Sequence, residues 1–352
     1  MTVSSFDHPF LSGFLGDEET AALFSAKADL DAMLAFEAAL AAAEGGEGII
    51  PAAAAGAIEN AISGFHPDTA ALREATARDG VVVPELVRQL REAAGEHGKH
   101  VHFGATSQDV VDTSLAMRLT KALDLFGAKL GALDGALADL DNRFGKLEVM
   151  AHTRMQAAIP VRASRKIASW RDPPARCGGR LEGIRADVAI LHFGGAAGTL
   201  DKLGDKASAV SEALAEKLGL VAVERARHSE RDGIVAYVSW LSLVTGCLGK
   251  MGQDVTLLAQ SEVGEITLAS GGGSSAMPHK VNPVGAEALV ALARFNATLV
   301  AGVHQALVHE NERSGAAWTL EWLILPQMTV ATGAALRIAT ELAANISFNG
   351  RG

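Results

Sequence analysis

The sequence is poor in cysteine, in aromatic residues and in positive charge. Only two of its 352 residues are cysteines, and the positions of Cys177 and Cys247 form neither a metal-binding spacing nor a disulfide framework. Aromatic residues make up 5% of the chain, and the formal net charge is −10. The lack of aromatics beside abundant Ala and Leu favours packed helices over sheets. The negative charge argues against nucleic acid as a partner.

Long uncharged runs and a basic leader are also missing. The longest uncharged run extends from Ile234 to Gly249, which is shorter than the roughly 20 residues of a typical membrane span. The first Lys or Arg is Lys27, so the N-terminus lacks the basic segment of a signal peptide. We therefore expect a cytoplasmic protein that does not span a membrane.

Apolar residues recur at helical spacing in two long stretches, one between Leu115 and Phe144 and the other between Ile234 and Leu258. In both, successive apolar positions are three or four residues apart, which places them on one face of a helix. A third long helix is expected from Pro283 past Leu307. Helices of this length bury a single stripe only by packing side by side, so the sequence predicts an all-α fold built on a long helical bundle.

Shorter helices are expected before the first long one. Asp17 is suited to cap a helix that continues to Gly45. Three more helix starts are predicted, at Pro51, Asp68 and Pro84. The stretch RDPPARCGGR, Arg171 to Arg180, places two prolines and two glycines where the flanking residues favour a helix. It is either a true helix break or an error in the sequence.

The segment from Gly271 to Pro283 reads GGGSSAMPHKVNP and lies between two predicted helices. Such a run is often only a turn, and it lacks the patterns of phosphate-binding and dinucleotide-binding loops. Alternatively, its glycines let backbone N–H groups approach an anion, while Lys280 and Asn282 add a charge and a neutral donor. A serine held among these donors could act as a base, and the set suits removal of a proton next to a carboxylate.

Three blocks of the sequence resemble the fumarase/aspartase superfamily, in the order found there. Residues 274–283 match its signature Ser-Ser-x-Met-Pro-x-Lys-x-Asn-Pro. HFGATSQDVVDTS (His102 to Ser114) resembles its first block, and TRMQAAIP (Thr153 to Pro160) its second. The resemblance implies an all-α fold of the fumarase/aspartase type. It also implies a homotetramer in which each active site is shared by three subunits.

The resemblance further implies roles for single residues. Ser274, six residues before Lys280, resembles the catalytic serine, while Lys280 and Asn282 resemble the groups that bind a carboxylate and stabilise the intermediate. Further substrate contacts are expected from Thr106, Ser107, Gln156, Ser275 and Met277. His279 is assigned no role.

The second block departs from the superfamily at Arg154, where a His usually protonates or holds the leaving group. Arginine stays protonated and cannot serve as an ordinary acid. Losing the His would be severe where hydroxide leaves, since its conjugate acid has a pKa of about 15.7. A carboxylate, with a conjugate-acid pKa of about 4, leaves without an acid. Arginine can hold it by a two-pronged hydrogen bond, so the substitution points to lactone chemistry and a cycloisomerase.

Four further stretches resemble the 3-carboxy-cis,cis-muconate cycloisomerase family: MLAFEAALAAAEGGEGIIP, GGAAGTL, HSERD and HENERSGAAWTLEW. The resemblance thus covers nearly the whole chain except Arg171 to Arg180. It implies that a carboxylate oxygen of a small tricarboxylate adds to a conjugated double bond and that Ser274 delivers a proton to carbon. The product is a carboxymuconolactone of aromatic degradation, in the β-ketoadipate pathway, and neither a metal nor an organic cofactor is needed.

Other functions stay open at this point. A related enzyme that accepts a sulfonate in place of one carboxylate would need similar cations. An adenylosuccinate-type lyase that releases fumarate would need another residue in place of the missing His. A non-catalytic use of the fold is a third reading, although the set Ser274, Lys280 and Asn282 argues against it.

Several charged residues outside the signature are further candidates. Arg231, in HSERD, is expected to bind a third substrate carboxylate, with a surface salt bridge as the alternative. His102 is either a substrate contact or a structural histidine. Glu287 lies thirteen residues after Ser274, where adenylosuccinate lyases use a Glu to orient the catalytic His. We therefore predict an Arg154–Glu287 ion pair, against the alternative of a solvated helix Glu.

Asp109 and Asp112 are expected to cap or pair locally, and His228 and the region His309 to Arg313 are weaker candidates. The expected organisation is an N-terminal helical domain over residues 1–105 and a central bundle over residues 106–340. Residues 341–352 are expected to be a remnant of the small C-terminal domain into which related enzymes usually continue.

Overall fold

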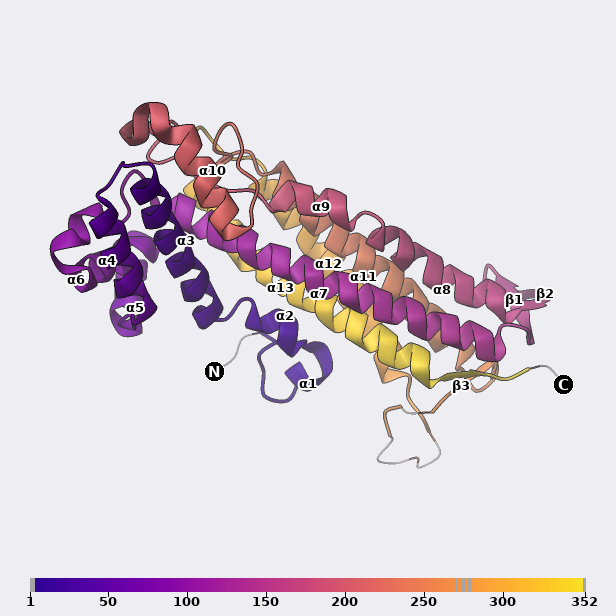
Figure 1. Cartoon of the computed structure of the whole chain (residues 1–352). Helices are drawn as coiled ribbons and strands as arrows, with labels where there is room; N and C mark the ends of the chain where they lie inside the picture. Colours follow the sequence, from indigo (N-terminus) through magenta and orange to yellow (C-terminus); the bar gives the residue numbers. More distant parts are fainter. Residues whose placement is uncertain (1–3, 270, 274–276, 278–279, 351–352) are drawn as a thin grey trace.

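The computed structural model describes residues 4–269, 271–273, 277 and 280–350, and its main body is a bundle of long helices (Figure 1). The four longest are α7 (Ser107–Phe144), α11 (Asp232–Leu258), α12 (Val284–Ala306) and α13 (Gly315–Asn345). Helices α8 (Ala163–Gly178) and α9 (Leu181–Val188) pack along α7 and α11. The predicted all-α fold with a long bundle is confirmed.

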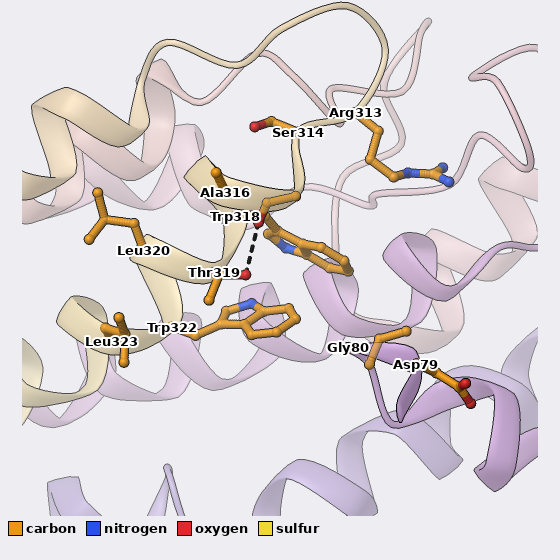
Figure 2. Close-up of a pocket in the computed structure, with 12 residues that line it drawn as sticks. Asp79, Gly80, Arg313, Ser314, Ala316, Trp318, Thr319, Leu320, Trp322 and Leu323 are labelled. Atoms are coloured by element: carbon orange, nitrogen blue, oxygen red, sulfur yellow. Dashed lines mark hydrogen bonds between the residues drawn. The ribbon is translucent and has the colours of Figure 1, made fainter. Parts of the chain in front are cut away.

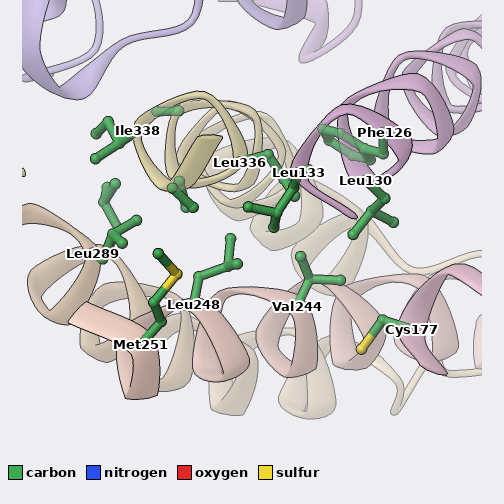
Figure 3. Packing of buried hydrophobic residues seen from close by; sticks show 14 of the residues in the cluster. Phe126, Leu130, Leu133, Cys177, Val244, Leu248, Met251, Leu289, Leu336 and Ile338 are labelled. Carbon is green, nitrogen blue, oxygen red and sulfur yellow. The ribbon is translucent and has the colours of Figure 1, made fainter. Parts of the chain in front are cut away.

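Both predicted apolar stripes line the core of this bundle. Leu130 and Leu133 of α7 face Leu248 of α11, with Leu289 of α12 and Leu336 of α13 closing the same core (Figure 3). The stripe of α7 is buried up to Leu140, and only its last member, Phe144, is partly exposed. Burial of this continuous apolar surface is the main source of the bundle's stability.

The N-terminal helices form a second core beside one end of the bundle (Figure 1). They are α3 (Ala26–Gly46), α4 (Ala52–Ser63), α5 (Thr69–Asp79), α6 (Val83–Ala93) and the 3-10 helix η1 (Gly95–His100), whereas α1 (Ser12–Leu15) and α2 (Glu18–Ala22) pack against the bundle. The same core takes in η2 (Asp201–Lys206) and α10 (Ala207–Leu218). The N-terminal unit therefore does not end at residue 105, because α10 returns to it.

The predicted helix starts at Pro51, Asp68 and Pro84 are confirmed to within a residue. The single helix expected from Asp17 is wrong. Asp17 caps only α2, and a new cap at Ser25 starts α3. The third long helix is also shorter than expected, because α12 ends at Ala306.

The prolines of the segment Arg171 to Arg180 do not interrupt the helix. Pro173 and Pro174 lie inside α8, which continues to Gly178, and α9 begins at Leu181. The chain therefore leaves the helix at its glycines, which have the lowest helix propensity after proline.

Two short antiparallel pairs, not expected from the sequence, lie near the end of the bundle away from the N-terminal core (Figure 1). β1 (Glu148–Thr153) pairs with β2 (Gln156–Arg162), and β3 (Ile266–Leu268) pairs with β4 (Ile346–Phe348). Ile346 and Phe348 are buried, and the Phe348 ring stacks on Trp170. The described part of the expected C-terminal remnant is therefore the end of α13 and a strand packed into the bundle, which corrects the boundary at residue 341.

Three helices of the described chain, α11, α12 and α13, are long and apolar enough to cross a membrane by length and composition, although the longest uncharged run is short. In α11 and α13, 61% and 72% of the most apolar window is buried inside the bundle. In α12 only 28% is buried. Packing against the other helices accounts for α11 and α13, whereas most of the window in α12 is only partly buried or exposed.

Candidate active site

Two of the three sequence blocks lie at opposite ends of α7. Thr106 and Ser107 of the first block form the start of α7, whereas Arg154 of the second block lies in the β1–β2 hairpin beyond its end. The helix has 38 residues and is therefore about 57 Å long at roughly 1.5 Å per residue. Figure 1 shows the hairpin and the N-terminal core at opposite ends of the bundle.

The signature loop leaves the bundle on the same side as the hairpin. Phe348 of β4, the partner of β3, packs against Phe144 at the end of α7. Beyond β3, two backbone hydrogen bonds of 3.0 and 2.9 Å between Gly272 and Asn282 close the neck of the loop. The chain from Leu268 to Gly272, the step across the neck to Asn282 and the return to Lys280 together span at most about 26 Å, at roughly 3.5 Å per residue. Lys280 therefore lies within that distance of β3. Lys280 cannot reach Ser107 within one chain.

The start of α7 is held by the Asp109 carboxylate, which has no exposed surface. It accepts the N–H of Thr106 in a capping box, at 2.9 Å. It also accepts the N–H groups of Gly194 and Gly195 at 2.9 and 3.0 Å, and His228 Nε2 lies 2.7 Å from it. The local role expected for Asp109 is confirmed. His228 is a structural partner of this carboxylate, and Thr106 and Ser107 stay half-buried at the helix start.

Arg231 is buried in an ion-pair network, which overturns its expected role as a substrate ligand. Its Nη1 lies 2.7 Å from Asp112 Oδ2, and its Nε and Nη2 donate to Glu321 at 2.9 and 2.5 Å. Trp318 Nε1 also donates to Asp112, at 2.8 Å. With 2% of its surface exposed and its guanidinium held by two carboxylates, Arg231 is not accessible to a substrate. The alternative of a surface salt bridge is equally wrong, because the pair is internal.

The charges in this network stabilise one another. Burial alone would raise the pKa of Asp112, but the Arg231 guanidinium and neighbouring groups such as Gln108 together outweigh it, and the pKa of this carboxyl lies below its usual value. Burial likewise works against the charge of Arg231, but Asp112 and Glu321 outweigh it, and its pKa is raised. Asp112 therefore serves in pairing, but its charged partner lies 119 residues away, and only Gln108, which donates to it at 3.0 Å, is the local partner expected from the sequence.

The second block forms a tight hairpin with Arg154 and Met155 at its tip. Thr153 pairs with Gln156, and the two tip residues have φ angles of 50° and 65°. Two successive left-handed residues correspond to a type I′ turn, which usually takes Asn and Gly. A residue other than Asn or Gly costs about 1 kcal/mol or more of backbone strain in this conformation. Such strain is concentrated at functional sites. Arg154 and Gln156 are both exposed.

A hollow of about 1040 Å³ lies along this hairpin and is rich in cations. Besides Arg154, its lining includes Arg165, Lys166 and Lys250, with Asp254 as the one carboxylate. Lys250 pairs with Asp254, whereas Arg154 makes no ion pair with any described residue. The hairpin therefore presents a free guanidinium in positive surroundings, as binding of a carboxylate requires.

The predicted ion pair between Arg154 and Glu287 does not form within the chain. Glu287 is exposed in the first turn of α12, and none of the ion pairs between described residues joins it to Arg154. The prediction fails for a single chain, because the hairpin and the first turn of α12 are not brought into contact there.

A second hollow, of about 820 Å³, borders the first block (Figure 2). It lies between the turn at Gly80 and the start of α13, and Arg313, Trp318 and Trp322 line it. Arg313 Nε donates to Gln108 Oε1 at 2.8 Å, which ties this hollow to the first block. Sequence reasoning had missed Gln108 and Trp318 and ranked Arg313 low. The only sequence signal for these three residues was that each lies inside a stretch that resembles the superfamily or the cycloisomerase family.

The signature loop itself is described only in part. Ser274 and Ser275, with their expected roles, lie outside the described residues. Lys280 and Met277 are exposed, and the N–H of Lys280 donates to the Met277 carbonyl at 3.0 Å. His102 lies at the opposite end, where its Nδ1 is 2.6 Å from Glu37 Oε1. Among the described residues, no group of three or more His, Cys, Asp or Glu side chains is arranged to hold a metal.

Comparison with known proteins places this geometry in a family. Residues 17–296 match a protein family described as lyase. The 3-carboxy-cis,cis-muconate cycloisomerase of Pseudomonas aeruginosa is 42% identical over 91% of this chain and 72% of its own length. The chain belongs to the 3-carboxy-cis,cis-muconate cycloisomerase family, within these lyases.

Solved structures agree with this membership. The 3-carboxy-cis,cis-muconate lactonizing enzyme of Pseudomonas putida superposes with a TM-score of 0.92 at 39% identity, covering 97% of this chain and 78% of that one. A fumarate lyase from a Mesorhizobium species superposes with a TM-score of 0.89 at 32% identity, covering 95% and 76%. The cycloisomerase family thus shares its fold with fumarate lyases, and the fumarase/aspartase-type fold inferred from the three blocks is confirmed.

The buried network makes a prediction about stability. Replacing Arg231 by Met leaves Asp112 and Glu321 as unpaired buried carboxylates, which costs about 3–5 kcal/mol. Urea denaturation should show this as a lower midpoint. Arg225→Met, an exposed arginine in the preceding loop, is the control and should change stability by less than about 0.5 kcal/mol. An Arg231→Met protein of unchanged stability but raised KM would restore the substrate role.

Proposed function

We propose that this enzyme converts 3-carboxy-cis,cis-muconate to a carboxymuconolactone. The observation that carries the proposal is Arg154, displayed at the tip of a strained hairpin in a cationic hollow, where the superfamily has a proton-donating His. Arginine cannot donate that proton, but it can hold a carboxylate. A reaction in which a carboxylate attacks or leaves needs a group that holds this carboxylate, but no group that donates a proton to it.

In the proposed mechanism, one substrate carboxylate oxygen adds to the conjugated double bond. Arg154 fixes this carboxylate in the attacking position, which replaces a costly bimolecular encounter by a positioned one. The electrons collect on a neighbouring carboxylate, where Lys280 and Asn282 stabilise the developing charge. Ser274 then delivers its proton to carbon, and Gln156, Thr106, Ser107, Ser275 and Met277 hold the rest of the substrate.

The active site is proposed to be shared between chains of a homotetramer. What supports this is the length of α7, which keeps Thr106 and Ser107 far from Arg154 and Lys280 within one chain. The low burial of α12 within its own chain leaves one side of this helix open to packing against other copies.

The only partners proposed besides further copies of the chain are small carboxylates, and the site is proposed to work in the cytoplasm. An acidic protein does not attract nucleic acid by its overall field. The pathway proposed is aromatic degradation, since the substrate is a ring-cleavage product. A muconate with a sulfonate in place of one carboxylate would meet the same cations and is included in the test below.

The function is tested with a substrate panel followed by ultraviolet absorbance. Purified protein should consume 3-carboxy-cis,cis-muconate, since lactonisation removes a conjugated double bond. Adenylosuccinate and argininosuccinate should yield no fumarate. Fumarate release without muconate consumption would instead establish an elimination lyase, for which the Mesorhizobium likeness is the supporting observation. Preference for a sulfomuconate would keep the mechanism and change the substrate.

Replacing Ser274 by Ala should abolish most turnover and leave folding intact, because it removes only the proton donor. A fall in kcat of about 10²-fold or more is expected for loss of a positioned acid. Absorbance at saturating substrate measures kcat, and circular dichroism monitors the helices. Ser208→Ala, at an exposed position of α10, is the matched control. Activity of Ser274→Ala equal to that of the control would remove Ser274 from the mechanism.

Shared sites predict that two inactive variants can restore each other. Ser107→Ala and Lys280→Ala each damage every site when they assemble alone. Mixed assemblies contain some sites with both residues intact, so co-expression should restore a measurable fraction of wild-type turnover. Activity of the co-expressed mixture no higher than the mean of the two parents would show that each site lies within one chain.

A further inference from the structure

Two acidic residues of α3 lie against the first block with unsatisfied oxygens. Glu37 and Glu44 expose 2% and 0% of their surfaces. Glu37 uses one oxygen on His102 Nδ1, at 2.6 Å, and its other oxygen has no partner among the described atoms. Neither carboxylate oxygen of Glu44 has a hydrogen-bond partner among the described atoms. Buried carboxylates without partners are costly, so this arrangement requires an explanation.

The second nitrogen of the His102 ring faces outward. Nε2 makes no hydrogen bond within the described chain and is not among its fully buried polar atoms, and 13% of the His102 side chain is exposed. His102 has a φ of 62°, a conformation that histidine adopts only at a cost. The strained backbone and the Glu37 contact together fix the ring with one nitrogen inward and the other toward solvent, four residues before Thr106.

The groups around His102 favour its charged form. Burial lowers the pKa of the imidazole, but Glu37 and the more distant Asp109 of α7 outweigh burial and raise it above its usual value. Arg91 of α6 acts in the opposite direction. Glu44 adds no second negative charge at neutral pH, because burial and the charge of Glu37 raise its pKa to about 9.

We propose that Glu37 is a positioning residue that holds His102 as a charged donor, whose outward Nε2–H binds one carboxylate of the substrate. This deepens the proposed function and rests on it. A tricarboxylate needs several cations, and Arg231, the sequence-based candidate for the third, is consumed by Asp112 and Glu321. A carboxylate behind an imidazole fixes which nitrogen points outward and keeps that nitrogen a donor.

The inference is tested with Glu37→Gln, which keeps the shape and removes the charge. The KM for 3-carboxy-cis,cis-muconate at pH 7.5 should rise about tenfold, as for loss of one charge-assisted hydrogen bond, with kcat within twofold. The difference in KM should shrink toward pH 6, because a larger fraction of an imidazole without its carboxylate is protonated there. A KM ratio that does not change with pH would overturn the proposal.

Glu44→Gln is the matched control, since it replaces a neutral acid by a neutral amide on the same helix face. Its pH profile of KM should match the wild type. A shift in that profile equal to that of Glu37→Gln would assign the effect to general damage of α3. If Glu37→Gln does not fold, His102→Asn carries the test and should raise KM similarly. In the double variant that combines Glu37→Gln with His102→Asn, the two increases in KM should not add.

A measurement without turnover separates this inference from the proposed function. In spectra of the full protein labelled with ¹³C-histidine, the signal lost in His102→Asn identifies the ring. Its titration midpoint should fall in Glu37→Gln and stay constant in Glu44→Gln, and propane-1,2,3-tricarboxylate should shift the signal. An unchanged midpoint in Glu37→Gln overturns the positioning role even in an active enzyme. A wild-type protein inactive on muconates, with the expected titration and shift, refutes only the proposed substrate.

Discussion

The length of one helix constrains everything else in this molecule. Because α7 separates the first block from the hairpin and the signature loop by most of the bundle, no folding of a single chain can bring the proposed groups together. Its apolar stripe is buried almost throughout, so the helix cannot bend to shorten the gap without breaking the core. This separation is the reason why the residues proposed to meet one substrate are proposed to come from different chains. The long buried helix α7 thus both stabilises the bundle and keeps the two halves of the proposed site apart within one chain.

The buried charges at the start of α7 serve this architecture. Asp109 and the Arg231–Asp112–Glu321 network join α7, the loop before α11 and the start of α13 at one point. Such pairs add little net stability over apolar packing, but removing one partner is costly, so they specify an arrangement. Here they fix the positions of Thr106 and Ser107, which are proposed to meet groups carried by another chain. A rigid first block is what a site assembled from separate chains requires.

The sequence predicted the long helices well and the role of Arg231 badly, for one physical reason. Apolar residues three and four apart report burial directly, so the stripes of α7 and α11 could be read without knowing their partners. A charged residue reports only that it needs an opposite charge, and Arg231 finds it in Asp112 and Glu321, which lie far away in the sequence. The hairpin around Arg154 was missed because its turn carries neither Asn nor Gly. The Glu37–His102 contact spans 65 residues and has no local signature.

Charge balance connects these points. The protein carries a net charge of −10, and yet its proposed substrate carries three carboxylates, so binding depends on local cations against an unfavourable overall field. Arg231 contributes none, because its charge is neutralised inside. Of the exposed cations proposed to contact the substrate, Arg154 lies in the hairpin hollow and Lys280 in the loop. The proposed charge of His102 is balanced by Glu37, so its outward Nε2–H offers a donor rather than a net positive charge. A single half-site would therefore attract the substrate weakly, and strong binding is proposed to arise only where chains bring the half-sites together.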